Sequence, residues 1–204
     1  MKNEKLVKTA KLIDTILRII QGFLITGAFL ALAGAILMFV FRNQILASFH
    51  LADTSLSFGI LKLQLAPLEG LIDPQRLLST MILSIVYAVI VIAAIYYGLR
   101  LVRRIISPMK EGQPFVQGIS KDINKLAWYV LIVGFLAEAG AAWLSVRMLT
   151  TYNLDYIFHP GTVLNYSFNF SLNFTFVGVF AIILLLGYIF RYGEELQQQA
   201  DETL

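Results

Sequence analysis

One ionisable residue stands inside an apolar run that is long enough to cross a membrane. Glu138 lies just past the middle of the run 126–146, within the sequence AEAGAA. A charged group at that depth costs on the order of 2.5–3.5 kcal/mol on insertion scales, and such groups usually face a helix bundle interior or a cavity. The sequence leaves two alternative roles for Glu138: either it forms a structural hydrogen bond to another helix, or it binds a proton, an ion or a ligand.

Small residues around Glu138 favour a close helix contact at this level. Residues 137 and 139–142 are alanine or glycine, and the run 19–41 carries Gly27, Ala31 and Ala35 at spacings of four. Small residues let two helix backbones approach each other in a membrane. We therefore expect Glu138 to lie at a contact between these two runs.

Other chemistry-bearing residues form only weak patterns. His50 and His159, together with Asp53 or Asp155, make a poor metal-site pattern, and such residues are more often ordinary polar loop positions. The chain has no cysteine, and it lacks the phosphate-binding, dinucleotide, zinc-protease and serine-hydrolase signatures. We expect no metal and no cofactor, and an enzyme is the least favoured class.

Four apolar runs must position these residues. The chain of 204 residues is 58% hydrophobic and 14% charged, whereas soluble domains are about a quarter charged. About 20 apolar residues cross the hydrocarbon layer, and a shorter run crosses if it stands upright. The predicted spans are 19–41, 77–99, 126–146 and 174–190. The predicted fold class is an all-α membrane protein, with residues 1–204 forming one integral membrane domain.

Lysine and arginine positions predict the orientation of these spans. Twelve of them lie in the N-terminal segment, the loop 100–125 and the tail 191–204. Four lie in or next to the loops 43–75 and 148–173. Cytoplasmic segments carry the excess of positive charge. Both termini are therefore predicted to be cytoplasmic, in a multi-pass protein of the cell membrane.

The two outer loops have strand-like patterns. Residues 165–176, NYSFNFSLNFTF, alternate between polar and apolar without exception, which is typical of a strand. Residues 55–67, SLSFGILKLQLAP, alternate less regularly and change face around a bulge. We expect the two loops to pair as a small extracytoplasmic β-hairpin or sheet. Its aromatic face either packs on the helix ends or forms a ligand or partner surface.

The N-terminal segment predicts a basic amphipathic helix. Between residues 5 and 20 apolar side chains share one helical face, and Lys5, Lys8 and Lys11 lie elsewhere. Such a helix lies on the inner leaflet before turning into the first span, and it binds anionic lipid or a protein partner. The bilayer itself is therefore one expected partner.

The inner loop and the tail together resemble a known family. The segments SPMKEGQPFVQGISKDINKL and IFRYGEELQQQADETL are similar to the bacterial family called domain of unknown function 2975, with Gln199 replacing an expected acidic residue. The resemblance implies a four-helix membrane protein without established activity. Members are often encoded beside small Cro-like DNA-binding regulators. The matching positions are Gly112, Pro114, Phe115, Tyr192, Gly193, Leu196, Gln197, Asp201, Thr203 and Leu204.

These observations lead to one leading hypothesis and one alternative. The chain is predicted to be a non-enzymatic bacterial membrane protein, and residues 112–115 and 192–204 are predicted to bind a cytosolic helix-turn-helix regulator. It would act as membrane anchor or antagonist, with no direct contact to nucleic acid. A homo-oligomer is also compatible with the sequence. The alternative is a small transporter or ion-conducting subunit that uses Glu138.

Overall fold

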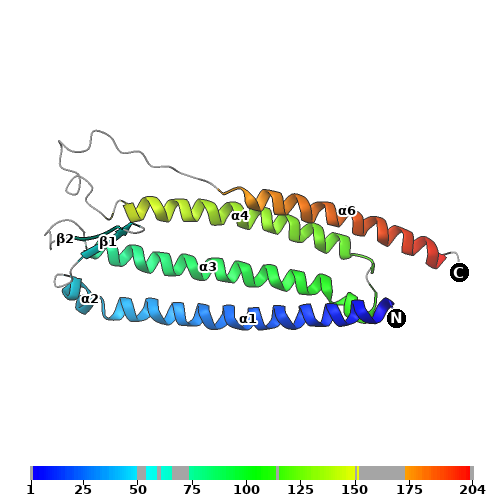
Figure 1. The fold of residues 1–204 in the computed structure, drawn as a ribbon, viewed down its shortest axis with the longest axis horizontal. Helices are drawn as coiled ribbons and strands as arrows, with labels where there is room; N and C mark the ends of the chain where they lie inside the picture. The colour runs from blue at the N-terminus through cyan, green and yellow to red at the C-terminus, as the bar shows by residue number, and fades with distance from the viewer. Residues whose placement is uncertain are drawn as a thin grey trace. The chain divides into compact units, whose positions relative to one another are not determined.

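A computed structural model describes residues 2–49, 54–58, 61–65, 74–113, 115–149, 151 and 173–202. Four long helices account for most of this part of the chain (Figure 1). They are α1 (Lys2–Val40), α3 (Pro74–Ile106), α4 (Ile119–Leu149) and α6 (Thr175–Glu202). Shorter elements are helix α2 (Arg42–Phe49), 3-10 helix η1 (Pro108–Glu111), and strands β1 (Thr54–Phe58) and β2 (Leu61–Leu65).

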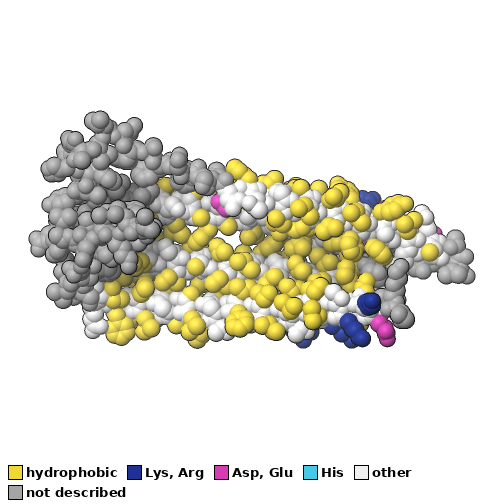
Figure 2. All heavy atoms as spheres, in the orientation of Figure 1, with side chains coloured by type: hydrophobic (Ala, Val, Ile, Leu, Met, Phe, Trp, Pro, Cys, Tyr) yellow, Lys and Arg dark blue, Asp and Glu magenta, His cyan; other side chains and the backbone are white. Residues whose placement is uncertain are grey.

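All four long helices are long and apolar enough to cross a membrane. Their candidate spans are Glu4–Val40, Gln75–Glu111, Ile119–Met148 and Thr175–Ala200. Large apolar side chains such as Phe23 and Phe29 are 75% and 72% exposed, and apolar side chains cover much of the visible helix surface (Figure 2). Lipid must replace water around such surfaces, so the structure is that expected of a multi-pass integral membrane protein.

The N-terminal segment and the first span form one uninterrupted helix. The predicted turn between an amphipathic helix and the span is wrong, because α1 is helical over all 39 residues. Ala10, Asp14 and Gln21 are buried at spacings of four and seven. These spacings put the three residues on one face of the helix. This face of α1 is buried within the protein, and the segment 5–20 is not a separate helix that lies on the leaflet.

The predicted sheet between the two outer loops is wrong. Both strands come from the first loop, where Thr54 pairs with Leu65 and Phe58 with Leu61 in antiparallel register. Closing a short local hairpin costs less entropy than pairing segments that are a hundred residues apart. Apart from these two five-residue strands, the elements of the described chain are helical.

The predicted second strand also ends in a helix. Thr175 begins α6, and its backbone N–H donates to the side chain of Asn173 over 2.9 Å. An asparagine that accepts from the residue two positions later is a typical helix N-cap. Capping therefore overrides the alternating pattern at the end of the predicted strand 165–176, whose residues 165–172 lie outside the described part.

The chain divides into two compact units. The first comprises Met1–Phe29, Ile90–Ala139 and Leu172–Leu204, and the second comprises Leu30–Val89 and Gly140–Ser171. The core of the first unit is formed by Ile105, Ile119 and Ile123, with Val116, Leu126, Ile183 and Phe190 packed against it. This core holds the end of α3 and the middle of α6 against the start of α4.

Glycine permits the close packing of α6 on α4 in the first unit. A β-carbon on Gly134 would lie 2.5 Å from the β-carbon of Phe176, and one on Gly187 would overlap the side chain of Asn124. Between these levels, the rings of Trp128 and Phe180 lie 5.3 Å apart. The two helices thus approach too closely for a larger residue at Gly134, whereas a larger residue at Gly187 would require the Asn124 side chain to move.

Proline and glycine form the connection from α3 to α4. Helix α3 ends at Ile106, two residues before Pro108, because proline has no N–H to donate and its ring obstructs a preceding helical turn. Pro108 instead opens η1, and Gly112 follows the end of η1 with a left-handed φ of 80°. Glycine adopts this conformation without steric cost. The chain can therefore reverse here and enter α4.

Candidate functional site

The inner loop and the tail helix, which carry the predicted partner-binding residues, are in contact. A β-carbon on Gly193 would lie 2.6 Å from the ring of Phe115, so the close approach depends on glycine. The same ring lies 5.5 Å from the ring of Phe190, centroid to centroid. The structure therefore brings together two predicted residues, Phe115 and Gly193, that are far apart in the sequence.

Glu194 makes a second contact between the tail and the loop. Its carboxylate accepts hydrogen bonds from the backbone N–H of Ser120 at 2.7 Å, from the Ser120 hydroxyl at 3.0 Å and from the Gly118 N–H at 3.4 Å. The first N–H groups of a helix have no partner within it, and negative charge is favourable there. Glu194 of α6 thus caps the start of α4.

Sequence reasoning missed this role of Glu194. Gly118 and Ser120 directly before a helical run were the available signal for a helix start. The carboxylate that caps it comes from the other end of the chain, which no local pattern can specify.

Three apolar side chains near this contact remain exposed. Tyr192 is 64% exposed, Leu196 48% and Phe115 37%. Tyr192 and Leu196 are four residues apart and therefore share a face of α6. Both follow Arg191, which ends the fourth apolar run. We call Phe115, Tyr192 and Leu196 the loop–tail surface.

The remaining predicted partner-binding residues lie around this surface or outside the described part. Gly112 forms the left-handed turn after η1, and Gln197 is exposed on α6. Asp201 belongs to α6, but its side chain is not described, and Pro114 lies outside the described residues.

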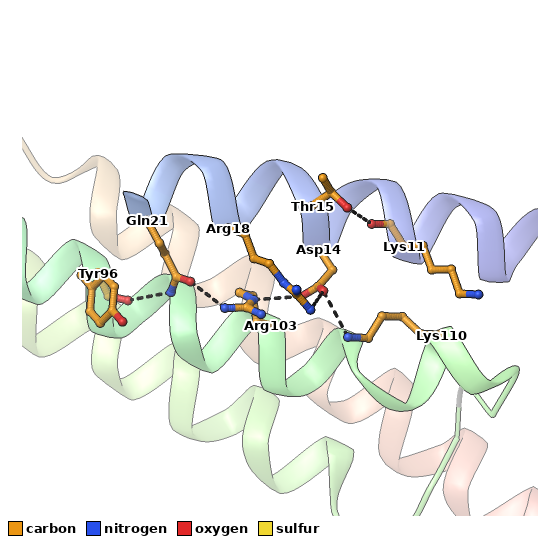
Figure 3. Close-up of polar contacts among 8 residues, drawn as sticks. All are labelled: Lys11, Asp14, Thr15, Arg18, Gln21, Tyr96, Arg103 and Lys110. Atoms are coloured by element: carbon orange, nitrogen blue, oxygen red, sulfur yellow. Dashed lines mark hydrogen bonds and ion pairs between the residues drawn. The ribbon is translucent and has the colours of Figure 1, made fainter. Parts of the chain in front are cut away.

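A buried carboxylate joins α1 to the end of α3 (Figure 3). Asp14 is only 4% exposed. Its Oδ1 accepts from Nε of Arg103 at 2.8 Å, while its Oδ2 accepts from Nη2 of Arg18 at 3.0 Å and from Nζ of Lys110 at 3.2 Å. Hydrogen bonds to charged donors offset the cost of burying the carboxylate. We call these four residues the Asp14 cluster.

Gln21 extends this connection by one further step along α1. Arg103 Nη1 donates to its Oε1 at 2.8 Å, and its Nε2 donates to the backbone oxygen of Tyr96 at 3.4 Å. Gln21 is itself buried. Asp14 and Gln21 are seven residues apart, so one arginine on α3 reaches both. Sequence reasoning missed the cluster, although two polar residues at this spacing on an otherwise apolar face were a signal.

Glu138 lies beside the residues that precede α6. It is half-buried, and its Oε2 accepts from the backbone N–H of Asn173 at 3.4 Å. Neither Gly27 nor Gly140 shows the predicted contact between α1 and α4. A β-carbon on Gly27 would meet no atom within 4 Å, and the neighbour of Gly140 is Tyr87 of α3. This contact supports a structural role for Glu138 at the start of α6.

Among the described residues, no group of three histidine, cysteine, aspartate or glutamate side chains could hold a metal ion. The four residues of the weak metal-site pattern, His50, Asp53, Asp155 and His159, lie outside the described part of the chain.

Comparison of the chain with protein-family models, with curated proteins and with solved structures finds no match. The resemblance of the inner loop and tail to the domain of unknown function 2975 family stays a prediction.

Proposed function

We propose that the chain is a non-enzymatic integral membrane protein that holds a cytosolic protein at its loop–tail surface. One observation carries this proposal. Phe115 packs on Gly193 while Glu194 caps α4 at Ser120, so the inner loop and the tail helix form one structural unit. A partner that docks there would contact both segments at once.

The exposed apolar residues supply the contact area for such a partner. Tyr192 and Leu196 continue the exposed row of Ile182, Leu185 and Ile189 past Arg191, beyond the fourth apolar run. Within the run this row faces lipid. Beyond it, exposed aromatic and leucine side chains such as Tyr192 and Leu196 are the kind of residues that anchor a protein interface.

Charge favours a basic partner. The tail after Arg191 contains four acidic residues and no lysine or arginine; the acidic residues are Glu194, Glu195, Asp201 and Glu202. DNA-binding domains carry a basic face, and complementary charge speeds and directs association. We infer that the partner is a small helix-turn-helix regulator, which the chain holds at the membrane and away from DNA.

Co-purification from detergent tests this proposal. The full chain would be compared with a chain that ends at Arg191 and with the double variant Tyr192→Ala, Leu196→Ala. We expect a small DNA-binding protein to co-purify with the unmodified chain and to be lost from both variants, as measured by quantitative mass spectrometry.

A matched double variant controls for the loss of exposed apolar area. Leu185→Ala and Ile189→Ala remove similar side chains from the same row of α6, but within the apolar run. The regulator should stay bound to this variant. Identical protein lists for all four chains would overturn the proposal, and so would the selective loss of a protein that is not a DNA-binding regulator.

A further inference from the structure

The Asp14 cluster contains more positive charge than its carboxylate requires. Arg103 and Lys110 pair with one oxygen each, and their side chains are only 29% and 23% exposed. Arg18 adds a third cation to the same carboxylate, with a side chain that is 63% exposed. The cluster therefore keeps an excess of positive charge, and the Arg18 guanidinium presents it at the surface.

Further cations precede Arg18 along α1. Lys8, Lys11 and Arg18 are separated by three and seven residues, which puts them on adjoining parts of one helix face. All three are exposed. Among the described residues, neither Lys8 nor Lys11 forms an ion pair, and Figure 3 shows the Lys11 ammonium extending away from the Asp14 carboxylate.

An exposed apolar row lies beside these cations. Leu12, Ile16 and Ile19 are 62%, 47% and 55% exposed, at spacings of four and three along α1. A helix with neighbouring cationic and apolar rows is typical of the membrane boundary, where its apolar side enters the acyl region and its cations meet head groups. This apolar row distinguishes the site from one for a soluble anion.

The cluster stands at the end of two spans. Arg18 directly precedes the predicted span 19–41, and Arg103 follows the predicted span 77–99 by four residues. Lipid phosphates lie at this depth, just outside the hydrocarbon layer. The cations are therefore placed where an anionic head group would be within reach of their side chains.

We propose that Lys11, Arg18 and the surplus charge of the Asp14 cluster bind the phosphate of an anionic phospholipid. Arg18 donates to the phosphate from the part of its guanidinium that does not contact Asp14, and Lys11 supplies a second cation. The acyl chains lie along Leu12, Ile16 and Ile19. This site is independent of the loop–tail surface and of any cytosolic partner.

Lipid titration of the full chain in detergent tests the proposal. Phosphatidylglycerol and phosphatidylcholine with identical acyl chains would be compared, and bound lipid would be counted by native mass spectrometry. We expect tighter binding of phosphatidylglycerol. Lys11→Gln and Arg18→Gln should each weaken it about five-fold, as expected for a cation near an anionic membrane surface. Arg18→Lys should retain most of the affinity.

Control variants separate a defined site from general attraction. Lys121→Gln with Lys125→Gln removes two exposed cations at the start of α4, and this pair should leave most of the affinity intact. The proposal would be overturned if this control pair lost as much affinity as Lys11→Gln or Arg18→Gln, or if the two lipids bound equally. Displacement of phosphatidylglycerol by low millimolar inorganic phosphate would identify a soluble-anion site and would also overturn it. Unchanged circular dichroism confirms that each variant is folded.

Discussion

Buried charge at Asp14 is the clearest polar determinant among the described residues. Its carboxylate side chain is 6% exposed and contacts three cations. Removing one partner of a buried ion pair leaves the other partners desolvated without compensation. The Asp14 carboxylate also links α1 to α3, because it accepts from Arg103, which lies 89 positions further along the chain. Its effect on stability should therefore exceed that of an exposed ion pair.

Asp14→Asn should destabilise the protein by about 2 kcal/mol, below the usual cost of breaking a fully buried pair because Arg103 and Lys110 keep some contact with water. Unfolding by sodium dodecyl sulfate in mixed micelles, followed by circular dichroism, measures this free energy. Arg18→Gln is the control, since this cation is mostly exposed and should contribute less than about 1 kcal/mol. Equal losses in the two variants would contradict the central role of Asp14.

Glu138→Gln separates the structural and the transport roles of this residue. The amide keeps an oxygen that can accept from Asn173, and the existing contact is long at 3.4 Å. We therefore expect the free energy of unfolding to change by less than about 1 kcal/mol. Proton and ion flux into vesicles that contain the purified chain should be the same for both forms. Flux that disappears in the variant would instead establish the transporter alternative.

At the scale of elements, glycine determines how closely α4 and α6 approach. Gly134→Ala should destabilise the protein by about 1–3 kcal/mol, the usual cost of overpacking. The new methyl group would lie against the β-carbon of Phe176, which cannot move without the backbone of α6. The same mixed-micelle unfolding measures the change.

Gly178→Ala is the matched control on α6. A β-carbon there meets no atom within 4 Å, so the substitution should be neutral or should stabilise the helix by up to about 1 kcal/mol through alanine's higher helix propensity. If both alanine variants behaved alike, the close packing at Gly134 would not contribute to stability.

The sequence predicts the helices much better than it predicts their contacts. Apolar runs bounded by Arg18 and Arg191 identify spans because the hydrocarbon layer imposes a length and a composition. Pairing is not local information. Thr54–Phe58 pairs with the neighbouring strand Leu61–Leu65, and the cap of α4 comes from Glu194. At the start of α6, the backbone N–H of Thr175 donates to the side chain of Asn173. The alternating pattern of this segment does not predict that helix start.

At the residue level, Phe115 and Gly193 were named because they match short motifs of the resembled family. The structure places these two residues in contact, while their role in binding a partner stays a prediction. Arg103 was counted only among the lysine and arginine residues of the loop 100–125, and Asp14 was not singled out. Their pairing depends on which face α1 turns to α3, and that face becomes visible only when both helices are in place.

At the scale of the whole molecule, the two proposed contacts use segments that are predicted to lie on the same side of the membrane. The N-terminal part of α1, η1 and the tail of α6 contain the cations, the buried carboxylate and the acidic residues on which the proposals rest. Two proposed contacts, one with a lipid phosphate and one with a basic protein, belong to this side. Both depend on the topology, which follows from the number of spans and from the charge distribution.

Cysteine accessibility tests this topology, and the chain suits the method because it contains no cysteine. Four spans put both termini on one side, and the excess of lysine and arginine predicts that this side is cytoplasmic. In a bacterial host, Asn43→Cys should react with a membrane-impermeant maleimide in intact cells. Lys5→Cys, Lys121→Cys and Gln197→Cys should react only after the membrane is permeabilised. Opposite behaviour of positions 5 and 197 would exclude an even number of spans. Complete inversion of the pattern would keep four spans but would place the loop–tail surface outside, where a cytosolic regulator cannot reach it.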